Sequence, residues 1–229
     1  MTAVPNEPPF IEWTPPTYTA ASIAEPISLK PHHAAYAALF EEEKSNLLSV
    51  LPNRVGLGGV GNREGDGGRR GPFIEHIGST AVPGLLAKPV VDIMVGYPYC
   101  DDKDDDHSSF LLDILAILRT LGYEYMGIAP SPNPTPLNTR HYFRKRPSTT
   151  THYNVHIIWS DSPIWRANVA FRDFLRVDEG ARRRYAHAKQ VAVNMGCVDL
   201  HTYSEAKKRM VGLLIEEALR WREGGQNSA

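Results

Sequence analysis

Two short segments hold residue types that could bind and transform a ligand. In the first, a strand-like run ends at Gly78, Ser79 and Thr80, and the next apolar run holds Asp92. Glycine lets the backbone approach a ligand closely, and amide and hydroxyl donors at a turn suit a phosphate group. A carboxylate inside an apolar strand is costly to bury unpaired, which favours a role for Asp92 in holding a metal beside that phosphate. The plainer alternative is a Ser-capped turn and a solvent-bonded aspartate.

The second segment is the run HYNVHIIW at residues 152–159, which predicts a strand. Successive side chains of a strand point to opposite faces, so His152, Asn154 and His156 share one face and apolar residues fill the other. The two imidazoles lie about 13 Å apart, too far to bind one metal together but suited to lining one cleft. We expect His156 and His152 to be catalytic or ligand-binding groups, with purely structural histidines as the alternative.

Charge is distributed unevenly along the chain. From residue 140 to residue 189 the sequence has 11 Lys or Arg against four Asp or Glu. Such an excess in one part of a nearly neutral chain favours a phosphate-bearing ligand. We expect a cationic rim that consists of Lys88, Arg140, Arg172 and Lys189. For Arg172, a structural ion pair with Asp173 is an equal alternative.

These groups need strands and helices to position them, and hydrophobic periodicity predicts both. Strands are expected at 73–77, 88–95, 140–144 and 151–159. Helices are expected at 31–50, 108–121, 163–177 and 181–194, and after a capping box formed by Thr202 and Glu205. This order of elements predicts an α/β fold of the mixed α+β kind.

The composition is that of a globular protein and excludes several classes. The 229 residues are 42% hydrophobic and 22% charged with a formal net charge of −1, which excludes a nucleic-acid-coating protein. No apolar run approaches the roughly 18 residues of a membrane span, and the N-terminus does not resemble a secretory signal. We therefore expect a cytoplasmic protein without membrane contact. With only Cys100 and Cys197, a disulfide scaffold is excluded and no disulfide-linked partner is expected.

Three segments are expected to lie outside the framework. Residues 1–27 hold six of the 18 prolines and predict a flexible arm before one domain at 28–222, with a flexible tail at 223–229. Gly56–Gly71 has eight glycines in 16 residues. Its G-x-G-x-x-G match precedes no helix-like run, so a flexible loop is favoured over a dinucleotide site. Asp101–Asp106 predicts a solvated acidic loop.

Several motifs, taken in order, resemble the GrpB family. They are EHIGSTAVPGLLAKPVVDIMV at 75–95, HYFR at 141–144, HYNVHII at 152–158, FRDFLR at 171–176, Tyr185 with Lys189, and Tyr203 with Lys207. The resemblance extends over residues 28–222 and implies a nucleotidyltransferase-like fold, with a small mixed sheet flanked by helices. The family is often labelled with dephospho-CoA kinase, but this chain has no P-loop, so kinase activity is not expected.

The resemblance also implies which residues would hold metals. In the nucleotidyltransferase-like fold, two carboxylates one residue apart and a third on a later strand hold two divalent metals. By this resemblance Gly78 and Ser79 match the turn and Asp92 matches the first carboxylate. Met94 stands in the place of the second, and the third would fall near Asn154 or His156, where no acid is present, so a two-metal site is not expected.

Three functions remain open from the sequence. The first is a transferase acting on a nucleotide or another phosphate-bearing small molecule. In it Asp92 holds one divalent metal (Mg²⁺, Mn²⁺ or Zn²⁺), the amides of residues 78–80 hold phosphate, and His156 is a general base or ligand. The second is a non-catalytic nucleotide-binding or interaction module that has lost the metal carboxylates. The third is a metal-dependent hydrolase that uses the same residues.

Overall fold

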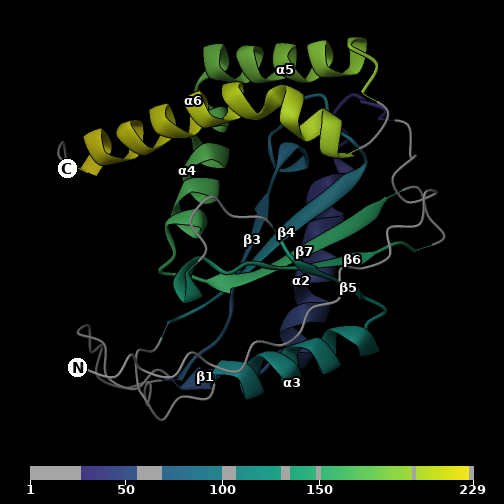
Figure 1. The fold of residues 1–229 in the computed structure, drawn as a ribbon, viewed down its shortest axis with the longest axis vertical. Coiled ribbons are helices and arrows are strands. Elements are labelled where there is room, and N and C mark those ends of the chain that lie inside the picture. Colours follow the sequence, from purple (N-terminus) through teal and green to yellow (C-terminus); the bar gives the residue numbers. More distant parts are fainter. Residues whose placement is uncertain are drawn as a thin grey trace, which may run out of the picture.

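A five-stranded mixed sheet forms the centre of the protein (Figure 1). The computed structural model describes residues 27–55, 69–99, 107–129, 135–147, 151–197 and 200–226. The strands are β3 (Phe73–Ile77), β4 (Val90–Tyr97), β5 (Glu124–Ile128), β6 (His141–Lys145) and β7 (His152–Trp159). Their order is β3-β4-β7-β6-β5, and neighbours pair antiparallel except β4 and β7, which run parallel. The two-residue strands β1 (Arg54–Val55) and β2 (Arg69–Arg70) form a separate ribbon.

Helices α2 (Ala35–Val50) and α3 (His107–Thr120) cover one face of this sheet, which we call the core face. Strand alternation produces it: every second side chain of β4 and β7 is apolar and points toward these helices. The buried sheet residues of this core include Val91, Ile93, Val95, Phe143, Val155 and Ile157. They pack against Tyr36, Phe40 and Leu47 of α2 and Ile114 and Leu118 of α3.

The opposite face of the sheet, which we call the site face, lies on the side of three further helices (Figure 1). They are α4 (Pro163–Val177), α5 (Glu179–Asn194) and α6 (Leu200–Gln226), which pack mainly on one another. Asp178 makes the corner between the first two, because its carboxylate accepts a hydrogen bond from the Ala181 amide and caps α5. Residues Ile164 and Trp165 of α4 pack on Met94 at one end of the site face.

The expected fold class, a small mixed sheet flanked by helices, is confirmed. The strand expected at 73–77 is β3 to the residue, and those at 140–144 and 151–159 form the antiparallel pair of β6 and β7. The strand expected at 88–95 is β4, shifted two residues along the chain. The helices expected at 31–50, 108–121, 163–177 and 181–194 are all present within a few residues.

Other expectations differ from the structure. Strand β5 was not predicted, because its Gly127 and the register shift beside it interrupt the alternation that marks a strand. The proposed capping box is wrong, because α6 begins at Leu200 and so Thr202 lies inside the helix. This helix extends to Gln226, past the expected domain end at 222. Residues 1–26, the 56–68 part of the glycine loop, Cys100 and the acidic loop lie outside the described residues.

Candidate functional site

Strand pairing arranges the polar residues of the site face in rows. Parallel pairing of β4 with β7 places Asp92 opposite Asn154 and Met94 opposite His156. Antiparallel pairing of β6 with β7 adds Arg144 to the first row and Tyr142 to the second. The strand expected to carry a His-Asn-His row therefore lies at the middle of the site, with Asp92 on one side of it.

Asp92 is held in one orientation by its neighbours. The Asn154 side-chain amide donates to Asp92 Oδ1 at 2.7 Å, and the Tyr142 hydroxyl donates to Asn154 Oδ1 at 3.0 Å. On the other side, the Gly78 backbone lies so close that a Cβ atom there would come within 2.5 Å of Asp92 Oδ2. Gly78 also has a φ of +72°, which favours glycine. The expected Gly78 turn and the carboxylate thus belong to one site.

Three cations lie near enough to this carboxylate to act on it electrostatically: Lys88, Lys207 and Arg140. In the described part of the chain none of them forms a direct ion pair with Asp92. Burial raises the pKa of Asp92 above its ordinary value, although the Asn154 hydrogen bond and the cations act in the opposite direction. Burial also lowers the pKa of Lys88 to about 8, against the influence of Asp92. The site therefore has excess positive charge to offer to an anion.

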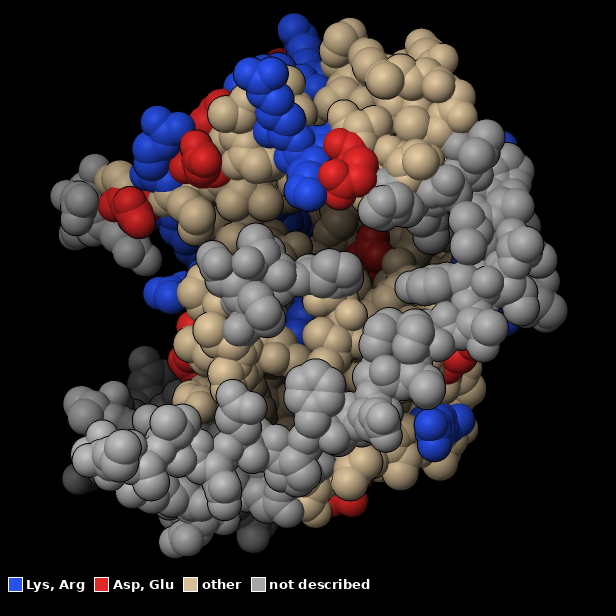
Figure 2. Space-filling model, viewed as in Figure 1, with Lys and Arg blue, Asp and Glu red and all other residues tan. Residues whose placement is uncertain are grey.

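The central residues line a concave surface. Asp92, His156, Arg140 and Lys88 each keep partial solvent exposure although protein atoms surround them on most sides. That combination is expected of groups at the floor of a hollow. Figure 2 shows the molecule hollowed between α6 and the strands, with acidic atoms at the bottom and Lys and Arg atoms around it.

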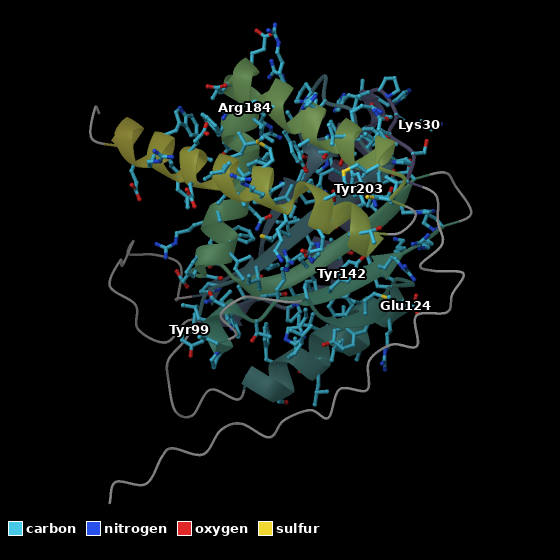
Figure 3. The ribbon with its side chains drawn as sticks, turned by 45° about the horizontal axis from the view of Figure 1, so that its top comes forward. Lys30, Tyr99, Glu124, Tyr142, Arg184 and Tyr203 are labelled. Carbon is cyan, nitrogen blue, oxygen red and sulfur yellow. The ribbon has the colours of Figure 1, made fainter. Side chains whose placement is uncertain are left out.

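The roof of the hollow includes the first turns of α6. Figure 3 shows Tyr203, on α6, above the strands that carry Tyr142. The Lys207 and Lys88 ammonium groups lie 4.6 Å and 5.9 Å from the centre of the Tyr203 ring. Cation–π attraction of this kind joins the helix to the segment that leads into β4.

The Gly78–Thr80 turn begins the 3₁₀ helix η1 (Ser79–Ala81). The hydroxyl of Thr80 is used internally, because it donates to the Val90 carbonyl at 2.8 Å and lies 3.0 Å from the buried His76 ring nitrogen. The hydroxyl of Ser79 accepts from the Lys189 ammonium at 3.1 Å. Of the three turn residues expected to bind phosphate through their amides, Gly78 contacts Asp92 directly, while Thr80 mainly braces the turn.

Lys189 and Arg172 support the structure around the site. Lys189 is fully buried, donates also to the Leu86 carbonyl, and has its pKa lowered to about 7 by burial, with Lys207 adding to the effect. Arg172 bonds to Glu75, to Asp173 and to the His76 carbonyl. The structure therefore favours the structural ion pair for Arg172, and places it away from the row that holds Asp92.

The two histidines of β7 have different surroundings. His156 stacks on Tyr142 with ring centres 5.0 Å apart, and its Nδ1 is buried without a hydrogen-bond partner among the described residues. Burial, with Arg140 nearby, holds the pKa of His156 well below its usual range, so the ring is neutral. Burial also lowers the pKa of His152, and Arg146, Arg144 and Lys88 add to this effect.

A divalent metal finds few ligands in this hollow. The described residues contain no group of three or more His, Cys, Asp and Glu side chains placed to share a metal ion. Met94, which the family resemblance aligns with a second carboxylate, is fully buried against Ile77, Ile158 and Trp165. One carboxylate among cations fits a bare divalent ion poorly. The expected single metal stays a prediction.

Three residues of the site were not among the expected site residues: Tyr142, Lys207 and Tyr203. Tyr142 could have been found, because it alternates with Phe143 on a predicted strand beside the His-Asn-His row. The other two lie on α6, and only the paired Tyr203 and Lys207 of the family motif pointed to them.

In the described part of the chain, no helix is both long and apolar enough to cross a membrane.

Comparisons with known proteins agree on one family. The GrpB protein family matches residues 26–217. The UPF0157 protein YqkA of Bacillus subtilis is 26% identical over 197 residues, which are 86% of this chain and 48% of that protein. The chain thus spans about half the length of this relative. A crystal structure of the conserved protein GrpB from Enterococcus faecalis matches at TM-score 0.61 and 27% identity, over 85% of this chain and 99% of that one.

A weaker likeness is to a polymerase. The Cid1 poly(U) polymerase matches at TM-score 0.40 and 11% identity, over 71% of this chain and 46% of that one. This likeness is too slight for an activity to be carried over.

Proposed function

Because the chain belongs to the GrpB family, whose fold does not define a reaction, we propose a function from the site itself. The protein binds a nucleotide or another phosphate-bearing small molecule in the hollow between α6 and the sheet, and transfers a group to or from it. The observation that carries the proposal is a deeply set carboxylate, Asp92, which feels the charge of Lys88, Lys207 and Arg140 but, among the described residues, forms no direct ion pair with any of them. Cations left in excess around one acid favour an anionic ligand.

The side chains divide the work between binding and chemistry. The cations neutralise the phosphate charge, and the backbone at Gly78 allows the ligand close to the carboxylate. Asp92, oriented by Asn154 and with a raised pKa, is suited to accept a proton from an acceptor hydroxyl. The neutral His156 ring beside Tyr142 is the second candidate for that proton.

Ligand binding is tested first, by a thermal-shift screen with AMP and ATP, each with and without Mg²⁺, Mn²⁺ or Zn²⁺. A ligand at 100 times its Kd adds about 2.7 kcal/mol to the free energy of unfolding, a shift of a few degrees at this size. We expect Lys207→Met to lose this shift. Lys208→Met is the matched control, because Lys208 is its neighbour on α6 and is exposed beside Glu205. Equal shifts in both variants, or none in the wild type with any nucleotide, would refute the binding site.

Catalysis is tested with Asp92→Asn, which keeps the shape of the side chain and its acceptor for Asn154. If the protein is a transferase, this variant still binds nucleotide but loses turnover, measured by mass spectrometry of the products. Asp113→Asn is the control, because Asp113 is exposed on α3 behind the opposite face. Unchanged turnover in Asp92→Asn would remove Asp92 from the chemistry.

One observation favours a second candidate, a binding module without catalysis. Met94 is fully buried in an apolar cluster, so the place of a second metal carboxylate is filled by packing. In this case nucleotide binds, Lys207→Met abolishes binding, and no product forms with any nucleotide. The two candidates therefore separate on turnover alone.

A further inference from the structure

The basic residues of the site face form two groups rather than one. The first surrounds Asp92, as described. The second lies around His152, farther toward the start of β7 and the end of β6. Arg144 faces Asn154 in the strand register, and Arg146, two residues later, falls beside His152 on the same side. Lys88 lies between the groups, because it acts on both Asp92 and His152.

Arg144, in the second group, has more donors than its neighbours among the described residues use. Arg144 is largely buried, with 11% of its side chain exposed, and donates through Nη2 to Glu124 at a long 3.5 Å. That acid is itself 67% exposed, and Figure 3 shows it farther out on the sheet than Tyr142. Arg144 Nε is buried with no hydrogen-bond partner among the described residues. A buried guanidinium nitrogen without an acceptor is costly, and a bound anion would satisfy it.

The charge around His152 is one-sided. Among the described residues, the charged groups that perturb this imidazole are cations, namely Arg146, Arg144 and Lys88. Burial and these cations lower the pKa of His152, which favours the neutral ring, and a neutral ring can accept or donate one hydrogen bond without adding charge. Two arginines, a lysine and a neutral imidazole on one surface form an arrangement suited to phosphate.

The two groups are centred on different residues of one strand face. His152 and Asn154 are two residues apart on β7, so their side chains lie about 7 Å from each other along the strand. Asn154 contacts Asp92, which marks the first group, and His152 marks the second. A ligand with two anionic groups about 7 Å apart would place one of them against each group.

We propose that His152, Arg144 and Arg146 form a second anion-binding site, and that the ligand of the hollow carries two separate anionic groups. This inference rests on the proposed function and narrows its substrate to bis-anionic compounds. A nucleoside with phosphates on two different sugar positions carries two separate anionic groups, whereas a nucleoside monophosphate carries only one.

Isothermal titration with two probes tests the second site: AMP, and adenosine 3′,5′-bisphosphate. Hydrogen bonds to charged groups contribute on the order of 1.5–3 kcal/mol, so the bisphosphate should bind at least tenfold more tightly than AMP. In Arg146→Gln this ratio should fall to about twofold or less, while the Kd for AMP changes by less than about twofold. Arg183→Gln is the control, because Arg183 is 77% exposed on α5.

Two kinds of failure are distinguishable. If the wild type binds both probes equally, or if Arg146→Gln weakens both equally, the second site is refuted and nucleotide binding stands. If the wild type binds neither probe, the proposed function and the second site fall together. The melting temperature of each variant, measured without ligand, shows whether the substitution has harmed the fold.

Discussion

The core face and the site face are built by alternate residues of the same strands, yet they hold charge in different ways. On the core face, the buried Glu43 of α2 accepts from Lys145 at 2.7 Å and from the Tyr123 hydroxyl at 2.9 Å. On the site face, Asp92 has one such partner, Asn154, and its neighbouring cations stay apart from it. Charge that is paired internally stabilises a fold, whereas charge left unpaired beside a hollow is available to a ligand.

The largest loss of stability is expected at the contact between the Gly78 backbone and the Asp92 carboxylate on the site face. Gly78→Ala would force a side chain into the left-handed region and push a methyl group against Asp92 Oδ2. We expect a loss of about 3 kcal/mol in the free energy of unfolding, measured by urea denaturation. Gly84→Ala is the control, because Gly84 has a φ of +76° but open space around it, and should cost about 1 kcal/mol. Equal losses would show that the Asp92 contact is not tight.

The next effect tests pairing on the core face. Lys145→Met removes one partner of Glu43 and should lower the free energy of unfolding by about 2 kcal/mol, less than for a fully buried pair because Lys145 is 22% exposed. Adding Glu43→Leu should restore most of that loss, since the unpaired acid is then gone. A double variant that is less stable than Lys145→Met would contradict the assignment of this face as a paired one.

Asp92→Asn is expected to stabilise the protein. Burial raises the pKa of Asp92 in the folded state above its ordinary 3.8, so the folded protein pays for ionising it. That penalty is absent at pH values below the ordinary pKa and grows as the pH rises through it toward the folded pKa. The variant should therefore gain on the order of 1 kcal/mol at pH 7 and little at pH 3.5. A loss of stability at pH 7 would mean that the cations pair with Asp92 more closely than the structure shows.

The smallest effects come from a matched pair of tyrosines. On the core face, Tyr125 bonds through its hydroxyl to His141 Nδ1 at 2.8 Å, and on the site face Tyr142 bonds to Asn154. Tyr125→Phe should cost about 1 kcal/mol, because it leaves a partly buried ring nitrogen of His141 unpaired, and it should leave nucleotide affinity unchanged. Tyr142→Phe should cost about 0.5 kcal/mol but weaken nucleotide binding, because Asn154 and Asp92 lose their fixed orientation. The reverse pattern in calorimetry would exchange the roles of the two faces.

The sequence was sufficient to predict features that depend only on neighbouring residues within one strand. Alternation alone placed His152, Asn154 and His156 on one face, and strand pairing brought Asp92 to that row. The sequence pattern could not place Lys207, because the position of α6 over the sheet depends on packing among three helices. Nor could it decide Arg172, since a Phe-Arg-Asp sequence on a helix can face a pocket or bond to Glu75. These are tertiary contacts that periodicity does not encode.

The parallel pairing of β4 and β7 has a consequence for how the protein matures. Asp92 and its partner Asn154 are 62 positions apart, and β5, β6 and α3 are made between them. A nascent chain emerging from the ribosome can form α2, β3 and β4 early. The floor of the hollow cannot form until β7 has been synthesised, and its roof cannot form until α6 has been synthesised. Contacts this distant in sequence are slow to form. A ligand of the hollow would therefore bind only the finished protein, and its binding would report that folding is complete.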